Sequence, residues 1–347
     1  MHVKTEKTPQ RLPKKWTAVV TAVVTAAVLL FAAVMYLIPE ESRPAWVNEW
    51  LSASTSSAGA PTPGSSDADD ASGADLSAGG QLEVYYLDVG QADSILVRLP
   101  DGRNMLIDAG NNADGNKVVA YLQSLGVNKL DWVVGTHPHE DHIGGLDTVI
   151  QKMKVSRVLL PEIPDDQVPT TRTYNDVLDA MADKGLKADA AQAGRVLVRD
   201  RTNDLKIQVL SPQEGATFSG LNDYSIVLRL TYGSCSFLFT GDAETTAEQA
   251  MIASGAELHA DVLKLGHHGS STSTSQAFLD RVQPKYAIIS CGKDNDYGHP
   301  HKETLSRIKA SGAQLYRTDR QGGLCVRCDG TAITVETGLP SCDGNAA

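Results

Sequence analysis

Three histidines and two acidic residues stand within six positions of one another in the segment Thr136-His137-Pro138-His139-Glu140-Asp141-His142-Ile143-Gly144-Gly145. The apolar run at residues 130–135, directly before it, is typical of a buried strand, and residues 146–153 after it have helical spacing. The segment is therefore expected to be a strand-to-helix loop, where functional groups usually gather. The glycine pair at its end is expected to let the backbone turn tightly.

The residue types in this segment suit a divalent transition metal, because imidazole nitrogens and carboxylate oxygens are common protein ligands of such ions. His137 and His139 flank a proline, so both side chains can point the same way. Asp141 and His142 follow on the next bend and can serve a second ion. The alternative, a polar loop of solvated histidines, does not explain why the pattern directly follows a buried strand.

Later segments repeat this arrangement of an apolar strand followed by polar residues. Asp242 follows Gly241 at the end of such a run, before residues 245–252 of helical character, and is either a metal ligand or the N-cap of that helix. His267 and His268 follow the run at 261–266, and His299 lies in a loop after the run at 287–292. The histidines thus gather in three clusters behind apolar strands, which predicts one assembled site.

These segments resemble the signature motifs of the metallo-β-lactamase superfamily, whose fold is a four-layer αββα sandwich with a metal site on one edge. Three further motifs resemble the hydrolase domain of competence DNA-uptake proteins of the ComEC type and its stand-alone secreted relatives. They are Leu87-Asp88-Val89-Gly90-Gln91-Ala92-Asp93-Ser94, Lys264-Leu265-Gly266-His267-His268-Gly269-Ser270 and Tyr297-Gly298-His299-Pro300. In the first motif alanine stands where glycine is usual. The resemblance covers about residues 81–335.

The resemblance implies two divalent ions, zinc or manganese, and a role for each ligand. One ion would be held by His137 and His139 and the other by Asp141, His142 and His267, with Asp242 between them. His267 is favoured over His268 as the ligand. Asp108, at the end of a strand, would brace the histidine loop by hydrogen bonds.

Further side chains are implied to contact substrate. The superfamily often has a third histidine before the strand at 226–232, which completes one metal site. This chain has Asn222 and Asp223 there, so either of these residues or water could take the position of that histidine. The resemblance makes Asp141, Lys264, His268 and His299 candidate catalytic residues, the last three as donors to developing negative charge. Ser270 is implied to hold a phosphate oxygen, and turn capping is favoured for Asp88 and Asp93.

The first 80 residues differ in composition from the rest. Residues 1–15 form a basic tail, and residues 16–38 carry no charge over a length that can cross a hydrocarbon core of about 30 Å. The basic tail predicts a cytoplasmic N-terminus, with the rest of the chain outside the cell membrane; a cleaved signal peptide is the alternative. Residues 39–80 are expected to be a flexible linker, and residues 81–347 the α/β hydrolase domain.

Charge and cysteine content limit the partners. The formal net charge is −11 and no basic run follows residue 80, which weighs against tight non-specific binding of nucleic acid. The chain has five cysteines, an odd number. Cys325 and Cys328 should face opposite sides of one strand, which argues against a redox or zinc pair. Cys328 with Cys342 is a candidate disulfide that the sequence does not settle.

Together these features predict a membrane-anchored, extracytoplasmic phosphodiesterase or nuclease. Its two metal ions would hold a hydroxide at neutral pH and stabilise an in-line displacement. The resemblance implies a part in DNA processing or uptake. Two alternatives stay open: an esterase of cell-wall phosphodiesters such as phosphorylcholine esters, and a non-catalytic surface binding module. The physiological substrate, the metal and the oligomeric state are not determined by the sequence.

Overall fold

The computed structural model describes residues 80–342. The predicted basic tail, membrane anchor and nearly all of the predicted linker lie outside these residues. Within the described part of the chain, no helix combines the length and the apolar character needed to cross a membrane.

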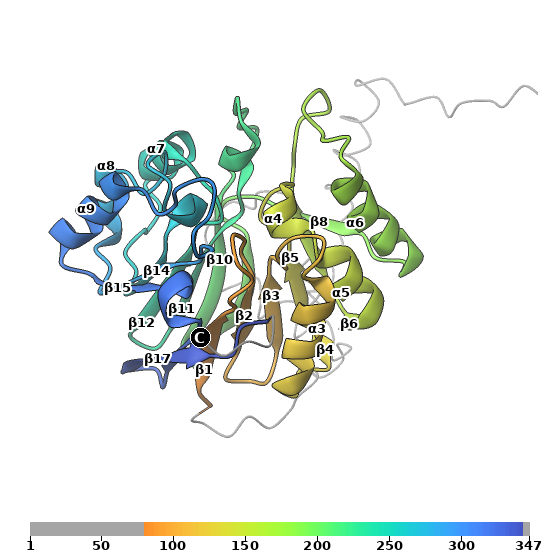
Figure 1. Cartoon of the computed structure of the whole chain (residues 1–347), viewed down its shortest axis with the longest axis horizontal. Coiled ribbons are helices and arrows are strands. Elements are labelled where there is room, and N and C mark those ends of the chain that lie inside the picture. The colour runs from red at the N-terminus through yellow and green to blue at the C-terminus, as the bar shows by residue number, and fades with distance from the viewer. Residues whose placement is uncertain (1–79, 343–347) are drawn as a thin grey trace, which may run out of the picture. The chain divides into compact units, whose positions relative to one another are not determined.

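Two large sheets form the framework (Figure 1). The first has eight strands, in the order β17 (Ile333–Leu339), β16 (Gly323–Cys328), β1 (Leu82–Tyr86), β2 (Ile95–Arg98), β3 (Asn104–Ile107), β5 (Trp132–Val134), β7 (Val158–Pro161) and β8 (Ala188–Ala191). The second has seven, in the order β15 (Gln314–Arg317), β14 (Tyr286–Ile289), β13 (Val262–Lys264), β12 (Cys235–Phe239), β11 (Val227–Tyr232), β10 (Leu205–Ser211) and β9 (Val196–Asp200). Two short strands, β4 (Lys129–Leu130) and β6 (Lys154–Val155), pair in parallel beside the first sheet.

Helices cover the outer face of each sheet. The first sheet carries α3 (Gly115–Ser124), α4 (Glu140–Ile143), α5 (Leu146–Lys152) and α6 (Arg172–Asp183). The second carries α7 (Thr245–Ala253), α8 (Gln276–Val282) and α9 (Lys302–Ser311), and α10 (Thr318–Gln321) follows β15. The short 3₁₀ turns η2 (Leu221–Tyr224) and η3 (Gly266–Gly269) lie on loops.

Three buried apolar clusters hold these layers together, and strand alternation explains them. In β1, Val84 and Tyr86 point into the cluster between the two sheets, whereas Tyr85 points into the cluster under the helices of the first sheet. Successive strand residues face opposite sides, and both sides are covered here, so central strands such as β5 are apolar on both faces. A third cluster, which includes Met251 and Phe278, packs helices against the second sheet. The predicted four-layer αββα arrangement is therefore observed.

The strand directions bring the polar loops to one edge. β3, β5, β7 and β8 run parallel, as do β12, β13, β14 and β15. Parallel strands end at the same edge of their sheet, and functional sites commonly lie beyond their carboxyl ends. The segments after β5, β12 and β13 carry all of the expected metal ligands, and those after β3 and β14 carry Asp108 and His299.

The glycine pair at the end of the histidine loop has a different function from the one expected. Gly144 and Gly145 both have ordinary negative φ angles, −55° and −87°. A Cβ atom on Gly144 would lie 2.3 Å from the backbone nitrogen of Asn112, and one on Gly145 would lie 2.4 Å from the carbonyl oxygen of Ala109. The pair is needed for close approach of two backbones and not for a left-handed turn.

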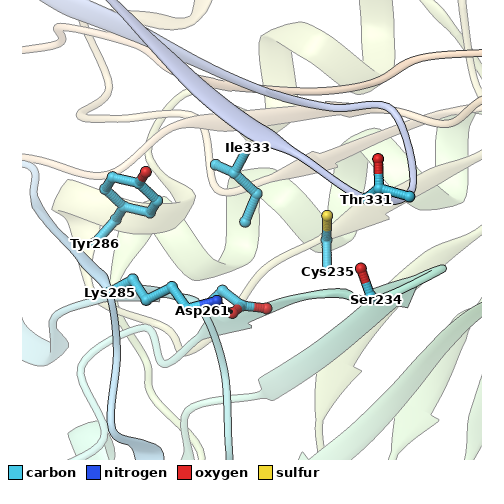
Figure 2. A pocket seen from close by; sticks show the side chains of 7 residues that line it. All are labelled: Ser234, Cys235, Asp261, Lys285, Tyr286, Thr331 and Ile333. Carbon is cyan, nitrogen blue, oxygen red and sulfur yellow. Dashed lines mark ion pairs between the residues drawn. The ribbon is translucent and has the colours of Figure 1, made fainter.

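The opposite edge, at the amino ends of β12, β13 and β14, carries a shallow hollow (Figure 2). It is lined by Ser234, Cys235, Asp261, Lys285, Tyr286, Thr331 and Ile333. Because the metal-ligand loops follow the carboxyl ends of the same strands, this hollow is separate from the candidate site.

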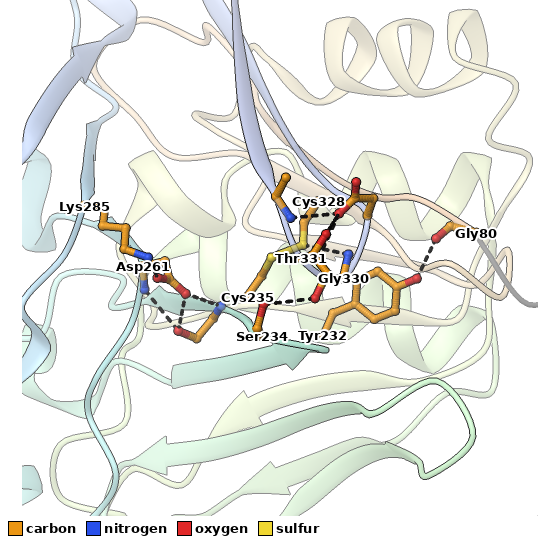
Figure 3. The surroundings of a disulfide bond; sticks show 12 residues. Gly80, Tyr232, Ser234, Cys235, Asp261, Lys285, Cys328, Gly330 and Thr331 are labelled. Carbon is orange, nitrogen blue, oxygen red and sulfur yellow. Dashed lines mark hydrogen bonds and ion pairs between the residues drawn. A yellow bond between two sulfur atoms is a disulfide. The ribbon is translucent and has the colours of Figure 1, made fainter.

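A disulfide links the two sheets beside this hollow (Figure 3). It joins Cys235 of β12 to Cys328 of β16, so the candidate pairing of Cys328 with Cys342 is wrong. The reason is that Cys328 points between the sheets, toward β12. Cys325 belongs to the cluster under the helices, which confirms that the two cysteines face opposite sides of the strand.

Candidate metal centre

Asp108 and Thr136 form a buried hydrogen-bonded group at the base of the site. Asp108 ends β3 with a φ of 58°, and its carboxylate accepts hydrogen bonds from the backbone N–H of Thr136 at 2.8 Å and its hydroxyl at 2.7 Å. The same carboxylate lies 2.8 Å from Nδ1 of His142, so that nitrogen carries the proton and Nε2 faces the opposite way. Such an outer contact fixes the tautomer and orientation of a ligating histidine, and Asp108 therefore occupies the bracing position expected of it.

Four side chains converge in front of His142. Asp141, His142, Asp242 and His268 each offer a ligand atom, and these atoms all lie within 4.8 Å of one another. Nε2 of His142 lies 3.2 Å from Oδ1 of Asp242, and Nε2 of His268 lies 3.1 Å from Oδ2 of Asp141. Nε2 of His142 and Oδ1 of Asp242 are buried with no hydrogen-bond partner. Buried polar atoms rarely stay unpaired, and a divalent cation would satisfy both, so the residues fit a metal ion.

His137 and His139 lie beside this group. Nε2 of His137 lies 3.0 Å from Nδ1 of His139 and 3.9 Å from Oδ2 of Asp242. Oδ1 of Asp242 thus faces His142, whereas Oδ2 lies within 4 Å of three other imidazoles, those of His137, His267 and His268.

The carboxylates of this cluster are ionised. Burial alone would raise the pKa of Asp242, but the imidazoles of His142 and His268 outweigh it and hold that pKa well below its usual value. Burial likewise opposes ionisation of Asp141, yet His142 and the hydrogen bond from His268 lower its pKa. Burial keeps the pKa of His137 well below its usual value, so this imidazole is neutral and has a nitrogen available for a ligand.

Of the two adjacent histidines in η3, the structure places His268, and not the expected His267, in the four-residue group. His268 is buried, and its Nδ1 lies 3.0 Å from the carbonyl oxygen of Ser290. The side chain of His267 is 25% exposed, and its Nδ1 lies 3.0 Å from Oε1 of Glu244. Its Nε2 lies 3.6 Å from Asp242, at the mouth of the site.

The backbone of the two histidines is unusual. Both residues have left-handed conformations, with φ of 48° at His267 and 52° at His268. A left-handed conformation costs about 1–2 kcal/mol for a residue other than glycine, and such strain clusters at functional sites.

Lys264 was expected to donate to negative charge on the substrate, but it lies elsewhere in the structure. Its ammonium is fully buried, 2.6 Å from Oδ2 of Asp93 and 2.9 Å from the carbonyl oxygen of Leu265. It therefore does not face the opening, where a substrate would bind. The physical reason is that Asp93 is itself buried and needs a counter-charge. The other oxygen of Asp93 lies 3.5 Å from Nδ1 of His268, so the pair stands directly behind a candidate ligand.

Of the three residues expected to bind substrate, only Asn222 borders the site. Its amide nitrogen lies 3.2 Å from Oε1 of Glu244, and its Oδ1 is buried without a hydrogen-bond partner. The carboxylate of Asp223 accepts from two backbone N–H groups at the start of α7, so it caps that helix. The hydroxyl of Ser270 pairs with that of Thr272 at 2.9 Å, within its own loop.

His299 lies beside the two histidines of η3, as expected. Its ring centroid is 5.4 Å from that of His267 and 6.3 Å from that of His268. Burial, reinforced by these two imidazoles, lowers the pKa of His299 to about 4. Nδ1 lies 3.4 Å from the side-chain nitrogen of Gln91, which leaves Nε2 to carry the proton. A neutral ring of this kind is a hydrogen-bond donor and not an imidazolium acid.

Sequence reasoning missed Asp93 and Glu244 as members of the site. A lysine inside an apolar strand was the available signal for Asp93, because a buried ammonium requires an acidic partner. Glu244 follows Asp242 by two residues, but nothing in the local pattern indicated its contact with His267.

Comparison with known proteins agrees with this geometry. Residues 87–293 match the model of the metallo-β-lactamase superfamily. The chain is 35% identical over 266 residues to ComE operon protein 3 of Bacillus subtilis, covering 71% of this chain and 33% of that protein. It is 34% identical to competence protein ComA of Neisseria gonorrhoeae over 246 residues, covering 70% and 32%. It is 31% identical to recombination protein 2 of Haemophilus influenzae over 232 residues, covering 65% and 26%.

This chain thus spans about a third or less of the length of each of these relatives. The residues that match the family model, 87–293, contain the histidine loop, the Asp242 loop and the paired histidines of η3. The fold, the convergence of these loops and the family match lead to one conclusion: this chain belongs to the metallo-β-lactamase superfamily and has its hydrolase fold.

Proposed function

We propose that this protein is a metal-dependent phosphodiesterase that acts on nucleic acid. The observation that carries the proposal is the group of Asp141, His142, Asp242 and His268, which contains two buried ligand atoms without partners. The neighbouring His137 and His139 would provide ligands for a second ion beside Asp242. The similarity to competence proteins supports nucleic acid as the substrate class.

Each side chain around the site would have its own role in the reaction. Divalent ions bound here would activate a water molecule and neutralise negative charge on a phosphate. Asp108 orients His142, and the Asp93–Lys264 pair lies behind His268. The neutral N–H of His299 is a donor for a phosphate oxygen, and a preorganised donor stabilises charge that develops in the transition state.

We further propose that residues 16–38 anchor the protein in the cell membrane with the hydrolase domain outside the cytoplasm. The disulfide between Cys235 and Cys328 supports this location, because disulfides persist in oxidising compartments and are rare in the cytosol. A part in DNA processing or uptake would follow from this placement.

A second candidate is an esterase of small or cell-wall phosphodiesters. The formal net charge of −11 favours it, because a protein that grips many phosphates of a long nucleic acid usually presents a basic surface. A non-catalytic binding module is the third alternative.

One experiment separates these alternatives. The full chain, purified in detergent and loaded with zinc or manganese, is given single-stranded DNA, double-stranded DNA and a small chromogenic phosphodiester, with Asp141→Ala as the control. DNA cleavage that disappears in the variant is the expected result. Turnover of the small ester alone would favour the esterase, and no turnover of any substrate would contradict the phosphodiesterase proposal.

A further inference from the structure

Among residues 80–342 the structure leaves three large apolar side chains exposed, and one of them lies next to the metal centre. Val168 and Leu178 are 40% and 38% exposed, whereas Tyr297 is 71% exposed. An exposed aromatic ring loses favourable burial, and Tyr297 is a member of none of the three apolar clusters. Its position is therefore not explained by the packing of the fold.

A series of rings connects Tyr297 to the candidate metal ligands. The ring of Tyr297 lies 5.7 Å from that of His299, with an interplanar angle of 22°. The ring of His299 in turn lies 6.3 Å from that of His268, at 25°. A series of three rings, each tilted by 22–25° from the next, therefore leads from a member of the metal-ligand group to the protein surface.

Hydrogen bonds hold the loop that carries this series. The side-chain nitrogen of Asn295 donates to the carbonyl oxygens of Gly292 at 2.9 Å and His299 at 2.6 Å, and its Oδ1 accepts from the N–H of His299 at 3.0 Å. His301 attaches this loop to the segment that follows η3, because its Nδ1 accepts a hydrogen bond from the backbone N–H of Ser271 at 2.9 Å. The exposed tyrosine is thus presented on a braced loop, and preorganised groups bind ligands with a smaller loss of conformational freedom.

We propose that Tyr297 is a stacking platform for an unpaired nucleobase next to the phosphodiester that is cleaved, so that the preferred substrate is single-stranded nucleic acid. The inference rests on the proposed function and adds a binding subsite to it. Aromatic side chains stack on bases of any sequence, because every base has a π-face. The contact between a ring and a neutral base does not itself need a positive charge, so it adds affinity for nucleic acid that does not come from neutralising phosphates.

The charges of the loop that carries Tyr297 favour a neutral base over a phosphate beside this ring. The loop carries Lys293, Asp294 and Asp296, and Asp296 is adjacent to Tyr297. The two carboxylates outnumber the one lysine, so the loop has no net positive charge to offer a phosphate, whereas the face of a neutral base needs none. A quaternary ammonium such as choline also binds aromatic rings, in cages formed by several of them. Tyr297 is too exposed to be part of an enclosed cage, so the base is favoured.

The test compares base-bearing and abasic substrates. The full chain in detergent, loaded with manganese, is given a short single-stranded oligonucleotide and the same oligonucleotide with abasic residues around the cleaved bond. We expect Tyr297→Ala to lower kcat/KM for the base-bearing substrate about 5- to 150-fold, the factor that corresponds to one base stack. We expect little change for the abasic substrate, and recovery in Tyr297→Trp. Leu178→Ala, a truncation of another exposed apolar side chain, is the control and should match the wild type on both.

Several results would overturn the stacking platform. They are an equal loss on both substrates, no loss on either, or a loss seen only with a phosphorylcholine ester. If the wild type cleaves no nucleic acid, the proposed function fails by itself. The platform is then tested by binding, as fluorescence anisotropy of the two labelled oligonucleotides. A preference for the base-bearing oligonucleotide that disappears in Tyr297→Ala would support the platform, and no preference would refute it.

Discussion

Replacing Lys264 with methionine should destabilise the protein strongly. Both Lys264 and Asp93 are almost completely buried, and the distance between their charged atoms is 2.6 Å. Methionine keeps most of the side-chain volume but leaves the carboxylate of Asp93 without its counter-charge. Removing one partner of a buried ion pair costs about 3–5 kcal/mol, a large part of the total stability of about 5–15 kcal/mol that is common for folded domains.

The assay is urea unfolding of the full chain in detergent and EDTA, followed by circular dichroism, so that bound metal does not contribute to stability. Lys129→Met is the matched control, because Lys129 pairs with Asp131 at the surface with 47% of its side chain exposed. Such surface pairs contribute about 0–1 kcal/mol. The double variant Lys264→Met/Asp93→Asn, which leaves no unpaired charge, should recover much of the lost stability.

Two results would refute this reasoning. One is a Lys264→Met variant that is as stable as Lys129→Met, since a buried carboxylate would then tolerate the loss of its partner. The other is a double variant whose loss equals the sum of the two single losses, because residues that interact directly should not be additive.

Three further predictions concern individual side chains. His268→Ala should lose about one equivalent of zinc per chain by elemental analysis, while His267→Ala should retain it; the reverse pattern would restore the sequence-based choice. Burial raises the pKa of the Cys291 and Cys325 thiols to about 12, so iodoacetamide at pH 8 should modify them only after unfolding, and rapid labelling of the folded protein in peptide mass spectra would contradict their burial. Because the pKa of His299 is lowered to about 4, its cationic form is expected only below that pH, and an NMR titration with a midpoint near pH 6 would contradict the neutral donor.

The fold was predictable because its signals are local. The alternation in β1 and the apolar run of β5 determine which faces are buried, and the histidine loop has a spacing that marks both the fold and the metal chemistry. The expected positions of Asp108, His142 and Asp242 agree with the structure for the same reason. Each of them lies on the segment that follows an apolar strand, and the ends of parallel strands meet at one edge.

The remaining differences arise from contacts that a local pattern does not contain. Sequence spacing cannot distinguish His267 from His268, because the outcome depends on two consecutive left-handed residues. The burial of Lys264 depends on Asp93, which lies 171 positions earlier in the chain. The partner of Cys328 is determined by the packing of β16 against β12 across the two sheets.

The most direct test of the metal centre is anomalous diffraction from crystals of the zinc-loaded protein, measured at the zinc absorption edge. The predicted result is a peak about 2.0–2.2 Å from Nε2 of His142 and from an oxygen of Asp242. His268 and Asp141 should complete its surroundings. No peak at this position, with Nε2 of His142 hydrogen-bonded to another protein group instead, would contradict the account.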